Sequence, residues 1–532
     1  MLTAIDRILT PIDGIAARYA RPALSPRAVF AIWGGLLLLL FAMRAFVFTG
    51  TDADDAEQLI HMQNWALGYG ARNPPFFTWL VLMVEPIFGV SVAGVVFVKF
   101  VLLAGCYYLI YRSGVIVFGD RSLAALAALS PIALFYVAWD ATFHYTHSII
   151  LAFAVCLTFH QLLVLERRRD VTAYALLGIG IAFGLLSKYN YLIFVGVFLA
   201  AVLIERDMRR LFLDPRILVT AAVSLSLAAP HYYWLWQKRI SLSTIARDRF
   251  NPHGAIDELL NLGGIGESLG AAASFLLPLG ILCLLCFPRA LGLASLQPAP
   301  NARYRHILDM ILFGIVLATI IGVMAFGVER VRNHYMFLLI LFPLGFLLHA
   351  QTAGISARSR NLFAVSLVFI AVLVPTAVVI KYFIDPLRSG KAYFHVPYAE
   401  FASQIKAAGF SNGTIVGDWF GYPLAGNFRP YFPEARIVSL LEWQITFPKG
   451  SNPAGLTVSP RHGANGQCLL LWSPFDNNNR EAPVRVKAKA LLGVDLPPGT
   501  QSHFLTAEMT SGHGRKIRIG YILLPNGSGN CR

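Results

Sequence analysis

An acidic segment directly follows the first long apolar run of this chain. It places four carboxylates within six residues: Asp52, Asp54, Asp55 and Glu57. A positioned carboxylate can take a proton from a hydroxyl group during catalysis. Aspartate is also favoured at the N-cap and in the first turn of a helix, where backbone N–H groups lack partners. The local sequence leaves the catalytic and the helix-capping interpretations open.

A second unusual segment begins at Gly68 and reads Gly-Tyr-Gly-Ala-Arg-Asn-Pro-Pro-Phe-Phe-Thr-Trp-Leu. The pair Pro74-Pro75 ends one helix and starts another, because proline fits the first helical turn and disfavours helix before it. We expect a helix over residues 76–89 that lies in the membrane interface. A long connector with its own structure is typical of a functional loop.

Cationic side chains in other loops could bind an anionic ligand. They are Lys188, Arg330 and Arg332, with a cluster of Lys238, Arg239, Arg247 and Arg249. Such groups could stabilise the charge that develops on a phosphate. Each of them could instead reach to lipid head groups, which is common for Lys and Arg at the ends of spans. Both interpretations remain open.

Asp140, His144 and His147 are spaced at i, i+4 and i+7. On one helix they would share a face, and two histidines with a carboxylate could bind a divalent metal. The alternative is simple contact with water or head groups at the mouth of a span. A divalent metal and no cofactor at all are therefore both open.

The composition indicates a membrane protein. The 532 residues are 56% hydrophobic and only 14% charged, whereas soluble chains carry about 25% charged residues. This excludes an ordinary soluble enzyme, a disordered protein and a typical nucleic-acid binder. The net charge of +15 is better explained by loop arginines that orient membrane helices.

Eleven apolar runs are long enough, or nearly so, to be predicted as transmembrane helices. They cover residues 29–48, 91–111, 122–139, 147–165, 172–187, 189–204, 216–236, 266–287, 307–327, 335–349 and 362–382. Loop arginines such as those at 167–169 and 206–210 then fall on one side, which we assign to the cytoplasm. The outer side receives Lys188 and residues 49–90, 140–146, 237–262, 328–334 and 383–532.

Residues 383–532 have the composition of a small α/β domain outside the membrane. A helix is expected from Tyr398 to Gly409, where glycine ends it. Strands are expected at 413–417, 436–440, 467–472 and 517–522. Cys468 and Cys531 both lie in this domain, and a disulfide between them is one possibility.

The ordered motifs of the first external loop resemble those of integral-membrane GT-C glycosyltransferases that use lipid-linked sugars. The resemblance is closest to the bacterial protein O-mannosyltransferase-like and aminoarabinose lipid A transferase-like enzymes. The matching residues are Asp54-Asp55, Gly68-Tyr69, Pro74-Pro75, Trp79-Leu80, Gly184–Tyr189 and Arg332-Asn333-His334-Tyr335. The chain departs from the family in three places. Asp55 replaces the more usual Glu, and Gly-Tyr and Pro-Pro are further apart. The loop before the fourth span, where relatives often carry an acid, here reads Asp140-Ala-Thr-Phe-His-Tyr-Thr-His147.

The resemblance implies sugar transfer from a polyprenyl-phosphate donor to an envelope acceptor: lipid A or lipopolysaccharide, polysaccharide or protein. Asp54 or Asp55 would be the general base of an inverting displacement, and Asp54 is favoured as the first acid of the family pair. Asp55 would then orient the donor or a basic partner. Tyr69, Pro74, Pro75, Trp79, His334 and Tyr335 would shape the substrate loop. The enzyme would act on the periplasmic face of a bacterial inner membrane.

A transporter or flippase of lipid-linked sugars is the competing interpretation. Transporters often show internal repeats and broken helices with polar residues at mid-membrane. This chain keeps its acids at the outer end of a span and shows no internal repeat. These features favour the enzyme.

Overall fold

The structure is a computed structural model. It describes residues 25–70, 72–238, 240, 262–292, 297–299, 301–326, 331–388, 393–417, 421–439, 466–472, 484–485, 488–489, 496, 499–512 and 514–525. Arg239, Arg247, Arg249, Arg330 and Cys531 lie outside the described residues. The chain divides into two compact units: Met1–Leu39 with Phe100–Pro375, and Leu40–Lys99 with Thr376–Arg532. The acidic segment thus belongs to the same unit as the C-terminal residues.

Within the described residues, seven helical segments are long and apolar enough to cross a membrane. They are α2 (Pro26–Phe46), α5 (Val92–Phe118), α8 (Thr146–Arg168), α14 (Leu262–Cys286), α15 (Ala302–Phe326), Tyr335–Ala353 and α17 (Ala357–Arg388). Two bent pairs raise the number to nine: Arg121–Ala133 with Tyr136–Phe143, and α11 (Arg206–Phe212) with α12 (Ile217–Gln237). The chain is therefore a polytopic membrane protein.

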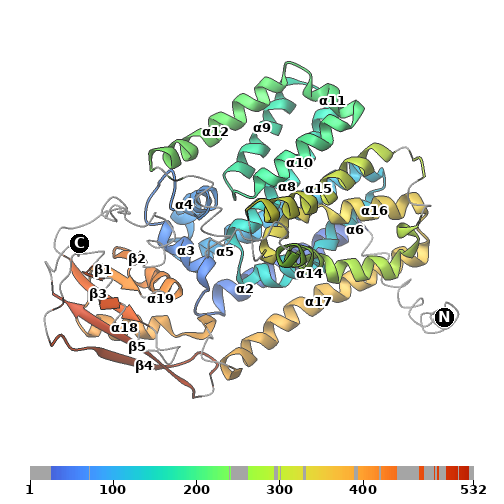
Figure 1. The fold of residues 1–532 in the computed structure, drawn as a ribbon. Coiled ribbons are helices and arrows are strands. Elements are labelled where there is room, and N and C mark those ends of the chain that lie inside the picture. Colours follow the sequence, from blue (N-terminus) through green and yellow to red (C-terminus); the bar gives the residue numbers. More distant parts are fainter. Residues whose placement is uncertain are drawn as a thin grey trace. The chain divides into compact units, whose positions relative to one another are not determined.

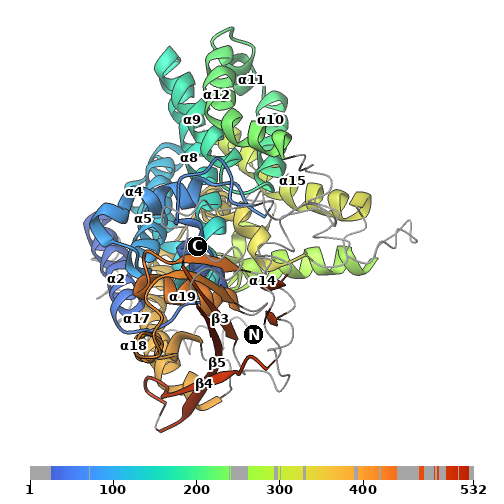
Figure 2. The ribbon, with the colours of Figure 1, turned by 90° about the vertical axis from the view of Figure 1, so that its left-hand side faces the viewer.

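The predicted number of eleven spans is too high by this measure. Two of the predicted runs form short helices, α9 (Val171–Leu185) of 15 residues and α10 (Tyr191–Ile204) of 14 residues. At a rise of about 1.5 Å per residue each is about 21–23 Å long, and a hydrocarbon core is about 30 Å thick. In the first unit α9 packs between α8 and α12, while α15 packs against α10 and α14 (Figures 1 and 2).

The second unit contains a five-stranded mixed sheet in the order β2-β1-β3-β5-β4. The strands are β1 (Gly413–Gly417), β2 (Arg436–Ser439), β3 (Gln467–Trp472), β4 (His503–Glu508) and β5 (Lys516–Leu524). β1 runs parallel to both β2 and β3, and β5 runs antiparallel to β3 and β4. The four predicted strands are confirmed, and β4 was not predicted because its alternation of buried and exposed residues is irregular.

Helices α18 (Tyr398–Ala407) and α19 (Gly421–Phe428) accompany the sheet, and their apolar side chains share its core. The predicted end of α18 is confirmed, since Gly409 has a φ of +99° that favours glycine. Two helices of the N-terminal part belong to the same unit: α3 (Ala53–His61) and α4 (Phe76–Phe88). α4 confirms the predicted helix after Pro75. Figure 1 shows α3 beside α19.

Candidate active site

The acidic segment forms the start of the short helix α3. Asp52 is its N-cap residue but makes no side-chain capping hydrogen bond, while Asp54 and Asp55 lie in the first turn. Every residue from Asp55 to His61 is buried. The acids thus occupy the N-cap and first turn, as the helix-capping interpretation expects, but burial gives each carboxylate a different environment.

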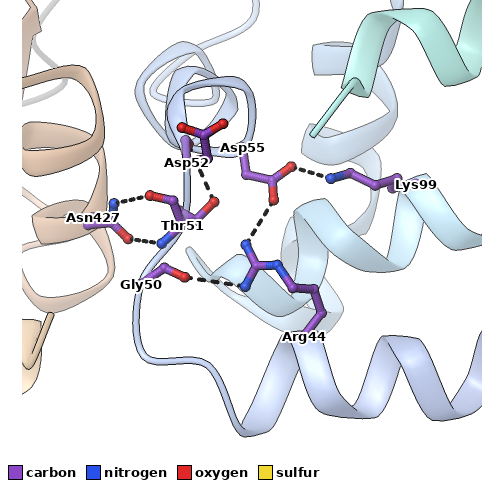
Figure 3. Close-up of polar contacts among 7 residues, drawn as sticks. All are labelled: Arg44, Gly50, Thr51, Asp52, Asp55, Lys99 and Asn427. Carbon is purple, nitrogen blue, oxygen red and sulfur yellow. Dashed lines mark hydrogen bonds and ion pairs between the residues drawn. The ribbon is translucent and has the colours of Figure 1, made fainter. Parts of the chain in front are cut away.

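Asp55 is held between two cations in the interior of its unit (Figure 3). Its Oδ2 accepts a hydrogen bond of 3.0 Å from Arg44, and its Oδ1 lies 2.7 Å from Nζ of Lys99. All three side chains are fully buried, with 0% exposure. Arg44 also donates to the carbonyl of Gly50 at 3.3 Å. Asp55 thus ties the end of α2 and the start of α5 to helix α3.

Arg44 and Lys99 were not among the residues predicted for the site. Both lie inside predicted apolar spans, 29–48 and 91–111, where an ionisable residue is expensive unless it is paired. This rule was the available signal, and it predicts a buried carboxylate partner for each. Asp55 is that partner for both cations.

Asp54 has a more open environment than Asp55. Its side chain is 25% exposed, and its Oδ1 lies 3.9 Å from a guanidinium nitrogen of Arg72. The same guanidinium lies 3.5 Å from Glu57, which is only 2% exposed. Asp54 is therefore a partly exposed carboxylate with a cation beside it. Arg72 was missed by sequence reasoning, although it lies within the segment that was singled out.

The loop between α3 and α4 is fixed by its own side chains. Tyr69 donates to the carbonyl of Asn64 at 2.8 Å and stacks on His61 with ring centroids 5.2 Å apart. Burial raises the pKa of the Tyr69 hydroxyl to about 12, so it remains a donor at neutral pH. Trp79 donates to the carbonyl of Ala66 at 2.8 Å. Tyr69 and Trp79 thus order the loop from within.

Two further contacts connect this loop to α3 and α4. Pro74 and Pro75 are both buried, and Pro75 is the N-cap residue of α4. Thr78 of α4 donates to the side chain of Gln58 of α3 at 2.7 Å, in a buried position. The two helices therefore form one ordered element. The proline pair starts α4 as predicted, but the preceding helix already ends at His61.

Lys188 lies in the other compact unit with a different set of partners. Its Nζ donates to Oγ of Ser148 at 2.9 Å, and it lies 4.9 Å from the centroid of the Tyr335 ring. Lys188 is only 6% exposed. Asn190 donates to the carbonyl of Tyr335 at 3.3 Å. The two motifs that contain Lys188 and Tyr335 therefore meet, although 147 residues separate them in the sequence.

The remaining predicted cations are more scattered. Arg332 is exposed and is the N-cap residue of the 3₁₀ helix η5 (Asn333–Leu339), which includes His334. The side chain of His334 is outside the described residues, as are Arg239 and Arg330 entirely. Lys238 is exposed at the C-terminal end of α12. Their role in donor binding stays a prediction.

The proposed metal set is not supported by the local backbone. Asp140 ends a π-helical turn, His144 is extended, and Tyr145 has a φ of +72° before α8 begins. The continuous helix expected to align Asp140, His144 and His147 is therefore interrupted, although Nε2 of His144 lies 3.9 Å from Oδ1 of Asp140; the metal site itself stays a prediction. No three His, Cys, Asp or Glu side chains of the described residues are placed to bind one metal ion.

Comparison with known proteins shows similarity to one enzyme class. Residues 72–234 match the model of the PMT_2 family, dolichyl-phosphate-mannose-protein mannosyltransferase. Two proteins of Rhizobium johnstonii, both described as lipopolysaccharide core galacturonosyltransferases, are similar over most of their length. RgtB is 27% identical over 77% of this chain and 82% of its own. RgtA is 28% identical over 82% of this chain and 86% of its own.

The chain is therefore similar to the PMT_2 family of GT-C glycosyltransferases over residues 72–234, and to two lipopolysaccharide core galacturonosyltransferases over most of its length. It is a membrane enzyme that uses a lipid-linked sugar donor, and the flippase alternative is set aside. The fold agrees. The crystal structure of ArnT from Cupriavidus metallidurans bound to undecaprenyl phosphate superimposes with a TM-score of 0.55 at 13% identity. It covers 92% of this chain and 97% of ArnT.

Proposed function

We propose that this PMT_2-like glycosyltransferase moves a galacturonic acid residue from a polyprenyl-phosphate donor to the lipopolysaccharide core. The sugar and the acceptor come from RgtA and RgtB, which align over 77% or more of this chain. The undecaprenyl phosphate bound to ArnT supports a donor carried on that lipid. The predicted topology supports reaction on the periplasmic face of a bacterial inner membrane.

The observation that carries the mechanism is the contrast between Asp54 and Asp55. Asp55 has both oxygens paired with buried cations, whereas Asp54 is 25% exposed. Asp54 is therefore our choice for the base. It accepts the proton of the acceptor hydroxyl while that oxygen attacks the anomeric carbon, and the bond to the donor phosphate oxygen breaks. The polyprenyl phosphate leaves as an anion, and the anomeric configuration inverts.

The leaving phosphate gains negative charge and needs cations nearby. Arg72, which lies beside Asp54, is one candidate. Lys188 is a second, because its ammonium is fixed by Ser148 and the Tyr335 ring. Arg332, Lys238, Arg239 and Arg330 complete the set that the sequence predicts. In this proposal these cations, and not a metal ion, stabilise the phosphate charge.

The test is sugar transfer by the full-length protein in lipid nanodiscs. Undecaprenyl-phosphate-linked galacturonic acid is the donor, and purified lipopolysaccharide core is the acceptor. We expect product with an inverted anomeric configuration, read by NMR, at a rate that EDTA leaves unchanged. Transfer to a protein acceptor but not to the core would overturn the proposed acceptor. Retention of configuration would overturn the single displacement.

A further inference from the structure

We propose that Asn427 and Gln63 are positioning residues for sugar transfer. Through these two amides the C-terminal α/β domain holds helix α3 at both ends, and with it the carboxylate of Asp54. The inference rests on the proposed role of Asp54 as the base. It gives the C-terminal domain a part in catalysis that does not depend on contact with either substrate.

Helix α3 needs support from outside itself. It has nine residues, and isolated helices shorter than about 12–15 residues are marginal in water. Its N-cap residue Asp52 makes no side-chain capping hydrogen bond. The orientation of Asp54 in its first turn must therefore be fixed by tertiary contacts.

The N-terminal end of α3 is held by Asn427 of α19 (Figure 3). The backbone N–H of Thr51 donates to Oδ1 of Asn427 at 2.9 Å, and Nδ2 of Asn427 donates to the carbonyl of Thr51 at 3.0 Å. Both residues are buried. One amide thus satisfies both polar groups of one backbone residue, as a neighbouring strand would.

The C-terminal end of α3 is held by an equivalent contact. Gln63 accepts a hydrogen bond of 2.7 Å from the backbone N–H of Ile437, and its Nε2 donates to the carbonyl of Ile437 at 3.1 Å. The same Nε2 lies 2.7 Å from the carbonyl of Ile60 at the end of α3. Ile437 belongs to β2, the edge strand of the described sheet. Gln63 therefore connects the end of the helix to the sheet edge.

The middle of α3 lies directly against α19. A Cβ atom placed on Gly426 would come within 2.5 Å of the carbonyl oxygen of Ala56 and 2.9 Å of its Cβ. Glycine is thus required for this close approach of two helix backbones. Thr51, Ala56 and Gln63, which lie within α3 or just beyond its ends, all contact the C-terminal domain. Helix α3 therefore cannot shift without breaking one of these contacts.

This arrangement has a consequence for rate rather than for donor affinity. A general base must lie within hydrogen-bond reach of the proton it takes, and a misplacement of about 1 Å can cost roughly 100-fold. In the proposed mechanism the donor's phosphate is held mainly by cations outside α3 and its loop, such as Lys188. Loosening α3 should therefore lower kcat and leave the donor KM almost unchanged.

The test compares Asn427→Ala and Gln63→Ala with a matched control, Gln467→Ala, in the full-length enzyme. Gln467 also makes two amide contacts to backbone, accepting from the N–H of Ser411 at 3.1 Å and donating to the carbonyl of Gly409 at 3.0 Å. These contacts lie within the same domain and do not involve α3. We expect kcat to fall about 10- to 100-fold in Asn427→Ala and Gln63→Ala, while their donor KM stays within about twofold of wild type. In Gln467→Ala, kcat should also stay within about twofold of wild type.

Two results would overturn the proposal. One is an unchanged kcat in folded Asn427→Ala and Gln63→Ala enzymes while Asp54→Asn is inactive. The other is an equal loss in Gln467→Ala, which would indicate general domain stability. If Asn427→Ala does not fold, Asn427→Ser serves, because it removes the paired amide without adding a charge. An active Asp54→Asn enzyme would instead refute the proposed base.

Discussion

The ammonium of Lys99 lies 2.7 Å from Oδ1 of Asp55, and both side chains are completely buried. With Arg44 on the other carboxylate oxygen, Asp55 is one anion between two cations inside the protein. Removing one member of a buried charge pair costs far more than removing an exposed one, because it leaves an uncompensated charge. This geometry separates the two acids of the family motif into a buried pairing group and an open one.

The first prediction concerns stability. Asp55→Asn leaves both cations without a counter-charge, so it should destabilise the protein by about 3–5 kcal/mol. Lys99→Met should cost less, because the pair of Asp55 and Arg44 remains. Thermal unfolding in the same nanodiscs measures both effects. A larger loss for Lys99→Met than for Asp55→Asn would contradict the arrangement described for this cluster.

Part of this site was accessible from the sequence. The density of carboxylates after a span, the proline pair and the order of motifs indicated α3, α4 and their loop. The pairing of Asp55 with Lys99 could not be predicted from the sequence, because it joins residues from separate helices and depends on how these helices cross. The interrupted helix at His144 was also hidden, since the spacing of Asp140, His144 and His147 fits a regular helix.

The same limit applies to the C-terminal domain. Its strands were visible as short apolar runs, and the glycine at 409 marked the end of α18. Nothing in the local sequence of Asn427 or Gln63 showed that their amides pair with backbone hundreds of residues away. A boundary drawn where the composition changes, near Tyr382, therefore separates residues that fold in one compact unit.

The second prediction concerns the base. Asp54→Asn keeps the size of the side chain and removes its ability to take a proton, so transfer should slow by at least about 100-fold. Donor binding and the melting temperature should stay close to wild type, because the side chain is partly exposed. Asp52→Asn is the matched control, and its rate should be nearly unchanged. Wild-type transfer by Asp54→Asn would refute the mechanism.

The third prediction concerns donor binding. Lys188→Met removes the ammonium that Ser148 and Tyr335 hold, and it should raise the donor KM by about 10-fold or more. Ser148→Ala keeps the charge and loses one contact, so its effect should be smaller. Direct titration with undecaprenyl phosphate measures both. If Lys188→Met combined with Arg332→Met leaves the affinity intact, these cations are only interfacial anchors.

The fourth prediction concerns pH and the junction before α18. His395 is buried, its Nδ1 donates to the carbonyl of Thr510 at 3.1 Å, and burial lowers its pKa. The unfolded chain has a histidine pKa of about 6.5. Below that value the unfolded state binds more protons than the folded state. The contribution of His395 to stability is therefore complete above about pH 6.5 and declines as the pH falls through it.

His395→Asn isolates this effect. The asparagine amide can still donate to the Thr510 carbonyl, but it does not titrate. We expect the melting temperature of the wild-type enzyme to fall further between about pH 8 and pH 5.5 than that of His395→Asn. Thermal unfolding at both pH values measures the difference. Parallel pH dependences in the two proteins would show that His395 is protonated equally in the folded and unfolded states, contrary to its buried position.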